Sequence, residues 1–444
     1  MFNTKKALLI ALPFLATGAL VGCGKKYDVK LVVYNWEDYI DEGTDEMGNF
    51  DHVGTIEAFE KYYKENTGLT LKVDYRTFAT NEIMYAQIEK GSVSPDLVCP
   101  SDYMIQKMAN EGMLEPFSYD SEKDTYGASL SNWDKYGSPF IRTRFAEQKL
   151  SDNKTSFLQY AVPYFWGTMG FTYDPEAIKT SPIDTWECLW SDDANLKNAF
   201  SLKDSYRDSY VPAIFHVYKD EIAAIPEDDP DYNAKLSAIF NRCDDATIAK
   251  VEAALKEAKK KTVKNFEVDD GKSDIVNGNL KANLAWSGDS VFSMDQAEEA
   301  GKTLKYSLPT EGSNVWFDGW CMPKGANKEL AEEFVNFICA PENAAGCMEA
   351  VGYTSPIVGE EMWEYVEETY AAEEAMSNVY TVDLSFYFGD TVEDAKIRIS
   401  SDDAGRQFDA QYPTEAALKK CCLMKDFGSQ TEKVEAMWKR VKAA

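Results

Sequence analysis

The feature that most constrains the fold is a regular alternation of strand and helix patterns over residues 29–112. Val29 to Trp36 is a run of β-branched and apolar residues typical of a strand, and residues 69–75 alternate in polarity with a period of two. Apolar residues at helical spacing follow each strand, and glycines such as Gly68 end these helices. The alternation predicts β-α-β units, whose parallel strands form one sheet with helices packed on it.

The rest of the chain carries further patterns of both kinds. They predict strands over residues 96–99, 160–173, 280–286 and 303–308, and helices over 81–90, 245–261, 328–339 and 343–351. Asn81 is expected to cap the first of these helices. Residues 115–155 look irregular, and 380–411 form a polar stretch without a clear pattern. With 444 residues the chain should form more than one domain.

Charge and histidine content exclude several function classes. The net charge of −29 argues against nucleic acid and anionic lipid as partners, because both need a basic face. Such a charge either raises the local concentration of cations or simply keeps the chain soluble. The two histidines, His52 and His216, are each expected to be structural, which leaves little for a histidine base or a multi-histidine metal site. No cofactor is predicted.

The N-terminus has the pattern of an export signal. Lys5 and Lys6 precede the apolar residues 7–19, which are too few to span a membrane, and the sequence LVGC follows at residues 20–23. This resembles the bacterial lipoprotein signal, in which cleavage precedes the cysteine, here Cys23, and lipid is attached to it. We therefore expect residues 1–22 to be removed and the protein to be anchored outside the cytoplasmic membrane. An ordinary secretory signal is the alternative.

Eight further cysteines are scattered along the chain without C-x-x-C spacing, so a zinc cluster is not expected. Several of them, such as Cys99 and Cys339, lie in apolar runs and should pack as small hydrophobic side chains. Export permits disulfides, but the sequence leaves any pairing open.

Three short stretches place aromatic rings beside carboxylates and contain no basic residue: YNWEDY at 34–39, WSGD at 286–289 and WFDGW at 316–320. Ring faces attract ammonium groups, and carboxylates accept charge-assisted hydrogen bonds from them. The stretches therefore predict a site for a cationic ligand with an apolar body. Taken singly, Trp286 and Trp320 are expected to pack in the core, as are Phe165 and Trp166. Arg207 is expected to form a local ion pair with Asp204 or Asp208.

Six motifs in register resemble the polyamine-binding lipoproteins of the periplasmic-binding-protein superfamily, the receptors of spermidine/putrescine ABC importers. They are YNWEDY at 34–39, DLVCPSDY at 96–103, VPYFWG at 162–167, WSGD at 286–289, WFD at 316–318 and GYTSP at 352–356. The resemblance implies an α/β fold of type II, with a ligand cleft between two lobes joined by crossing segments. It places residues 29–166 and 316–360 in lobe 1, and 167–315 and 361–444 in lobe 2.

The resemblance also implies a set of ligand residues. The aromatic members of the predicted site are Trp36, Tyr39, Tyr103, Trp286, Trp316 and Tyr353. Ser101 would offer a hydroxyl, Asp318 would anchor one amine and Asp208 would hold the other end. Asp38 and Asp289 match acidic positions of putrescine-preferring members. Ser205 stands where spermidine binders have a further aspartate, which favours a diamine over a triamine.

The function implied is that of a monomeric binding protein, not an enzyme, which captures a polyamine outside the cytoplasm for the permease of an ABC importer. One alternative is a binding protein for another solute, such as a sugar, an iron complex or a quaternary amine. A second is a surface-anchored glycan hydrolase using Asp318 with Asp208 or Asp289, although no nucleophile motif or metal-ligand spacing supports it. A third is a solute sensor without transport.

Overall fold

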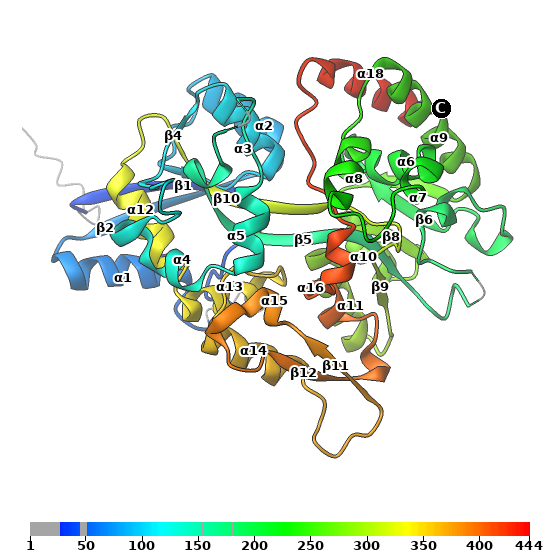
Figure 1. The fold of residues 1–444 in the computed structure, drawn as a ribbon. Helices are drawn as coiled ribbons and strands as arrows, with labels where there is room; N and C mark the ends of the chain where they lie inside the picture. The colour runs from blue at the N-terminus through cyan, green and yellow to red at the C-terminus, as the bar shows by residue number, and fades with distance from the viewer. Residues whose placement is uncertain (1–26, 45–50, 153, 180) are drawn as a thin grey trace, which may run out of the picture.

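The computed structural model describes residues 27–44, 51–152, 154–179 and 181–444. The predicted signal with Cys23 and part of the insertion at 41–53 lie outside these residues. The described chain forms two α/β bodies that are joined by long strands, with β5 running from one to the other (Figure 1). Among the described residues, no helix combines the length and apolarity that a membrane span requires.

The first body contains the β-α-β units predicted from the sequence. Its strands lie in the order β2-β1-β3-β10, and β1 pairs in parallel with both β2 and β3. The bounds are β1 Val29–Trp36, α1 Thr55–Thr67, β2 Leu71–Phe78, α2 Asn81–Glu89, β3 Leu97–Val98, α3 Asp102–Asn110 and β10 Val315–Pro323. The predicted cap was wrong by one residue: Thr80 caps α2, and its side chain accepts a hydrogen bond from the backbone N–H of Ile83.

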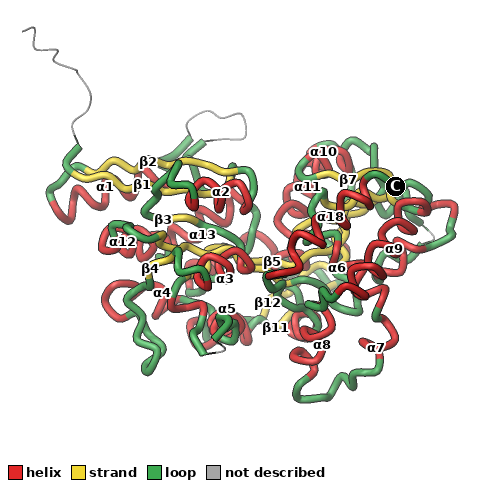
Figure 2. The backbone as a smooth tube through the Cα atoms, turned by 90° about the horizontal axis from the view of Figure 1, so that it is seen from above, coloured by secondary structure: helices red, strands yellow, loops and turns green. Residues whose placement is uncertain are grey.

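The sheet continues into the second body in the order β5-β8-β6-β7, with β9 also paired to β5. Seen from above, β5 spans the space between the halves, with α9 and α18 in the second (Figure 2). The bounds are β5 Ala161–Tyr173, β6 Phe200–Lys203, α9 Asp245–Lys261, β7 Val263–Glu267, β8 Ala282–Trp286, α11 Ser287–Glu299, β9 Lys305–Ser307 and α18 Thr431–Lys442. Strands β6 and β8 are parallel, so their carboxyl ends lie at the same edge.

The crossing strands β5 and β10 are antiparallel, and β10 is buried along its whole length. Their register slips in the middle: Asp318 lies opposite Phe165, whereas Gly319 lies opposite Pro163. Tyr164 is therefore an extra residue on β5, which makes the slip a β-bulge. A proline is tolerated in a central strand at such a point, because the ladder there does not need its missing N–H.

Two main hydrophobic clusters lie in the two bodies, and Trp286 packs against both. The first cluster contains residues from the part of the chain assigned by resemblance to lobe 2, namely Met362, Leu384, Phe408 and Leu418. The lobe boundaries stay a prediction, but this packing associates much of residues 362–418 with the first body.

The stretch at 380–411, which carried no clear pattern, forms a small sheet and two short helices, the second of which lies beside α11 of the second body (Figure 1). Tyr387 connects it to the crossing strand: its hydroxyl accepts a hydrogen bond from Trp166 Nε1 at 2.9 Å and donates one to the carbonyl of Ser355. The bounds are β11 Val379–Asp383, α15 Ser385–Phe388, β12 Lys396–Ser400 and α16 Gln407–Gln411.

The region at 115–155 is less irregular than expected, because two short helices, α4 Ser131–Tyr136 and α5 Pro139–Ala146, lie within it. The remaining elements are β4 Leu114–Glu115, α6 Tyr210–Val217, α7 Lys219–Ala223, α8 Tyr232–Phe240, α10 Asp270–Val276, α12 Lys328–Ile338, α13 Pro341–Val351, α14 Glu360–Tyr370 and α17 Glu415–Lys419.

Candidate functional site

The candidate site lies where strands of both bodies end. Trp36 ends β1, Ser101 precedes α3 after β3, and Trp286 ends β8 just before α11. Carboxyl ends of parallel strands are the usual location of ligands in open α/β sheets. Asp318 joins them from the crossing strand β10, where it forms an isolated β-bridge with Ser101.

Asp318 is a deeply buried carboxylate, with 6% of the residue exposed. Its Oδ2 accepts a hydrogen bond from the Tyr39 hydroxyl at 2.8 Å, while its Oδ1 has no hydrogen-bond partner of normal geometry among the described residues. Burial raises the pKa of Asp318 to about 6, although the hydroxyls of Ser101 and Tyr39 act in the opposite direction. The buried Oδ1 of Asp318, which lacks a hydrogen-bond donor within the described chain, is therefore suited to accept a hydrogen bond from a positively charged group such as an ammonium.

Three predicted aromatic residues gather around this carboxylate. Tyr353 packs edgewise against Tyr39 and Trp316, with ring centroids 5.6 and 5.2 Å apart. The indole Nε1 of Trp316 is buried without a hydrogen-bond partner among the described residues, as is that of Trp36. Trp36 is half-buried and packs on Phe78 with ring centroids 4.6 Å apart. The rings of Tyr39, Tyr353 and Trp316 thus form an apolar wall beside Asp318, while Trp36 lies at the end of β1.

A second group of residues surrounds Asp289, in the first turn of α11. Its Oδ1 accepts a hydrogen bond from the Tyr353 hydroxyl at 2.8 Å, and its Oδ2 accepts one from Lys203 Nζ at 2.9 Å. Burial acts to raise the pKa of Asp289, but the ammonium groups of Lys203 and Lys272 and these hydrogen bonds hold it below its ordinary value. Nearby, Trp286 Nε1 donates a hydrogen bond to Asp208 Oδ1 at 3.2 Å.

Ser101 and Tyr103 are connected through Asn81, which was predicted as a helix cap and not as a residue of the site. The side-chain amide of Asn81 donates to both hydroxyl oxygens at 3.0 Å. The guanidinium of Arg207 lies 3.7 Å from the centre of the Tyr103 ring. The expected ion pair of Arg207 with a nearby aspartate is wrong: within the described chain, its Nη2 donates to the carbonyl of Lys425 at 2.7 Å.

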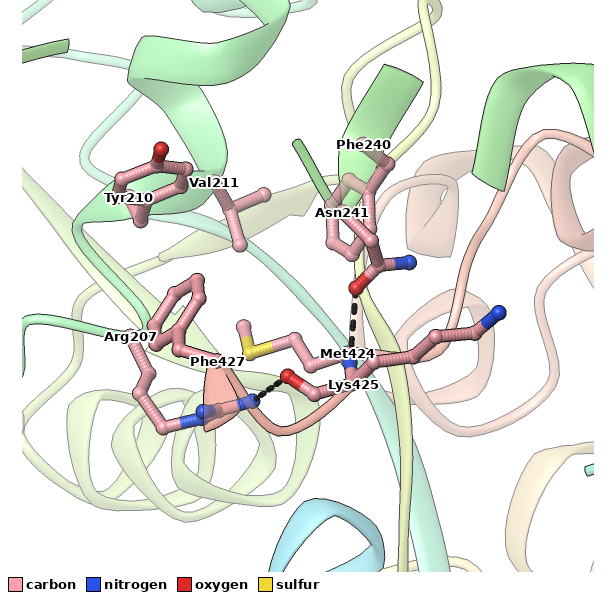
Figure 3. A pocket seen from close by; sticks show the side chains of 8 residues that line it. All are labelled: Arg207, Tyr210, Val211, Phe240, Asn241, Met424, Lys425 and Phe427. Atoms are coloured by element: carbon pink, nitrogen blue, oxygen red, sulfur yellow. Dashed lines mark hydrogen bonds between the residues drawn. The ribbon is translucent and has the colours of Figure 1, made fainter. Parts of the chain in front are cut away.

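Arg207 is one of the residues that line a small cavity (Figure 3). The wall also contains Asn241, whose Oδ1 accepts a hydrogen bond from the backbone N–H of Lys425 at 2.8 Å. None of the predicted ligand residues lines this cavity. The cavity is therefore not part of the candidate site.

The structure brings most of the predicted residues together, with some exceptions. Asp38 is exposed on the loop after β1, with a left-handed φ of 50°, and no hydrogen bond or ion pair within the described residues joins it to the others. Sequence reasoning missed Lys203 and Asp102. Asp102 is buried next to Asp318, and burial raises its pKa to about 8 despite the neighbouring Arg207. No predicted strand ended at Lys203, so no sequence signal pointed to it; Asp102 was present in the motif DLVCPSDY at 96–103 but was not assigned to the site.

Comparisons with known proteins agree with this arrangement. The family model described as bacterial extracellular solute-binding protein matches residues 56–376. The putrescine-binding periplasmic protein SpuD of Pseudomonas aeruginosa is 29% identical over 82% of this chain and 90% of its own length. The spermidine/putrescine-binding periplasmic protein of Salmonella typhimurium is 28% identical, over 78% and 83% of the two chains.

A solved structure gives the same result for the fold. The spermidine/putrescine ABC transporter substrate-binding protein PotD of Streptococcus pneumoniae superposes with a TM-score of 0.61 and 25% identity, covering 93% of this chain and 98% of that one. The predicted two-lobe α/β fold of periplasmic binding proteins is therefore confirmed.

Proposed function

Because the chain belongs to the family of bacterial extracellular solute-binding proteins, we propose that it binds a polyamine outside the cytoplasm and delivers it to the permease of an ABC importer. The relatives are binding proteins and not enzymes, which disfavours the hydrolase alternative. Their names specify putrescine and spermidine as ligands.

Asp318 is the observation that carries the proposal. A buried ammonium group needs a carboxylate or carbonyl partner, since an unpaired buried charge is prohibitively costly. The free Oδ1 of Asp318 meets that need inside an aromatic wall, whose faces add cation–π attraction of about 0.5–2 kcal/mol per well-placed ring. A neutral sugar would leave this carboxylate without a counter-charge, so the sugar alternative is disfavoured.

The other end of the ligand is assigned to Asp208, a half-buried carboxylate that accepts a hydrogen bond from Trp286. With Asp318 at one end and Asp208 at the other, the separation of two carboxylates selects the length of the ligand. The methylenes between the ammonium groups would lie against the predicted rings, with Ser101 close to Asp318. This arrangement favours a diamine such as putrescine, and Asp38 would lie at the rim.

The finer details of location belong to the same proposal. We expect lipid attached at Cys23 to hold the protein, as a monomer, at the outer face of the cytoplasmic membrane. The pattern at residues 5–23 supports this expectation. Mass spectrometry of the protein from its native membrane would test it, because lipidation adds the mass of the acyl chains to the fragment that begins at Cys23.

Calorimetry on the chain from residue 24 onward, titrated with putrescine, cadaverine, spermidine and maltose, tests the ligand class. Asp318→Ala should weaken diamine binding by at least about 30-fold, because it removes a buried charge partner. Trp316→Ala should weaken it by about tenfold through lost ring contact. The control is Glu176→Ala, whose side chain is 80% exposed, and it should bind as the wild type. Unchanged affinity in both site variants, or binding of maltose alone, would refute the proposal.

A further inference from the structure

Lys203 is a buried cation in the middle of the candidate site. Its side chain is 2% exposed, and its Nζ lies 2.9 Å from Asp289 Oδ2, 3.0 Å from the carbonyl of Val268 and 3.7 Å from the centre of the Trp286 ring. A carboxylate, a carbonyl and an indole face are the groups that bind a primary ammonium. Two of the three, Asp289 and Trp286, are residues predicted to contact the ligand.

The side chain of lysine is chemically an alkylammonium chain attached to the backbone. Beyond Cβ it consists of three methylenes and an ammonium group, which is n-propylammonium, a close analogue of half a polyamine. Strand β6 holds it there: Phe200 and Ser201 pair in parallel with Ala282 and Asn283 of β8, so Lys203 and the start of α11 meet at one edge of the sheet.

We propose that Lys203 is a tethered ligand mimic that permanently fills a cation subsite between Asp289 and Trp286, and thereby restricts the ligand to a diamine. This rests on the proposed function and specifies the ligand within it. Asp289 then holds Lys203 and Tyr353 and does not contact the ligand. Of the predicted carboxylates inside the site, Asp318 and Asp208 remain for ligand ammonium groups, and a third ammonium would have to displace a buried lysine.

The first experiment compares Lys203→Ala with Lys272→Ala. Lys272 Nζ lies 3.8 Å from the same aspartate, but its side chain is 30% exposed. Calorimetry at neutral pH should show that Lys203→Ala improves spermidine binding relative to putrescine by at least about tenfold, because an ammonium subsite becomes free. Lys272→Ala should leave the ratio within about twofold, because its partly exposed ammonium lies 3.8 Å from Asp289 and does not fill the subsite.

The second experiment adds back, as a free molecule, the alkylammonium group that Lys203→Ala removes. The melting temperature of Lys203→Ala should rise on addition of n-propylammonium chloride, relative to sodium chloride at the same ionic strength, because bound ligand stabilises the folded state. The wild type and the double variant Lys203→Ala with Asp289→Asn should show a clearly smaller rise, because only the positions at Asp318 and Asp208 are open to propylammonium in them.

The double variant Lys203→Met with Asp289→Asn tests the proposal even if Lys203→Ala does not fold, because a methionine of similar length keeps the subsite filled and no buried charge loses its partner. Its putrescine affinity should stay within about threefold of the wild type; a larger loss in the folded protein would place Asp289 on the ligand and overturn the proposal. An unchanged spermidine-to-putrescine ratio without propylammonium rescue would also overturn it. Rescue in a chain that binds no polyamine would instead refute the proposed function and keep the cation subsite.

Discussion

The state of Asp318 depends on competition between burial and hydrogen bonding at a single carboxyl group. Burial is the larger effect, so its pKa lies at about 6 in place of 3.8. For an acid with a raised pKa the folded state binds the proton more tightly. The ligand-free protein should therefore lose stability as the pH rises from about 4 to about 6. A bound ammonium group removes the destabilisation that comes from ionising the buried Asp318, because it supplies the missing counter-charge.

Diamine affinity should accordingly depend on pH. Below about pH 6 the carboxyl group must release its proton before it pairs with an ammonium, so affinity should fall by up to about tenfold per pH unit. Calorimetry between pH 5 and 7 measures this, below the range in which Asp102 titrates. Tyr39, Tyr353 and Cys99, which also face Asp318, all have raised pKa values and stay neutral there. Asp318→Asn should bind weakly with a flat profile; a wild-type affinity that is constant over this range would contradict the expectation.

The sequence predicted the members of the site better than their connections. Motifs in register identified Tyr39, Asp318 and Tyr353, which the structure brings into contact. It could not reveal that Lys203 reaches Asp289, 86 residues away, because that contact depends on the pairing of β6 with β8. The contacts of Arg207 were predicted wrongly for the same reason. Its sequence neighbours were expected to pair with it, whereas its observed contacts, Tyr103 and Lys425, come from distant segments.

Among the elements, the start of α11 is under a tight steric constraint. Gly288 faces the ring of Tyr353, and a Cβ built at position 288 would lie 2.4 Å from ring carbons. The side chain of Tyr353 can therefore reach Asp289 because residue 288 has no side chain. A glycine in the first turn of a helix is explained here by the close approach of the two bodies.

Gly288→Ala should separate the Tyr353 hydroxyl from the carboxylate of Asp289. We expect the free energy of unfolding to fall by about 1–3 kcal/mol through overpacking, and diamine affinity to fall by about tenfold with the loss of the Tyr353 hydrogen bond. Denaturant titration and calorimetry measure the two effects. Gly346→Ala in α13 is the matched control, since its nearest contact would be an ordinary 3.8 Å. Equal behaviour of the two variants would show that the contact at 288 does not matter.

Element prediction succeeded where the pattern was local and long. The helix expected over residues 245–261 is α9 with the same bounds, and the crossing strand over 160–173 is β5 with one residue fewer. It failed over 115–155 and 380–411, where short elements are stabilised by distant contacts such as that between Tyr387 and Trp166. Elements of four to eight residues are too short to show a period of their own.

At the scale of the whole molecule, the net charge of −29 gives the protein an overall negative field. The field should attract a dication before any contact forms. Stopped-flow tryptophan fluorescence should show that the association rate constant for putrescine falls by about tenfold between low and high salt, because ions screen this field. The dissociation rate constant should change by less than about threefold, since buried pairs are screened little. An association rate that is independent of salt would mean that the acidity serves solubility alone.

The bulge between β5 and β10 determines the side of the sheet to which the carboxylate of Asp318 points. Pro163 cannot offer an N–H to β10, and Gly319 donates its own N–H to Pro100, at 3.1 Å. A shift of the two strands by one position would require the donor that proline lacks. The same shift would turn the carboxylate of Asp318 to the opposite side of the sheet. The orientation of the Asp318 carboxylate is thus determined by an uncharged residue, Pro163. A redesign that reorients this carboxylate would therefore begin at residue 163.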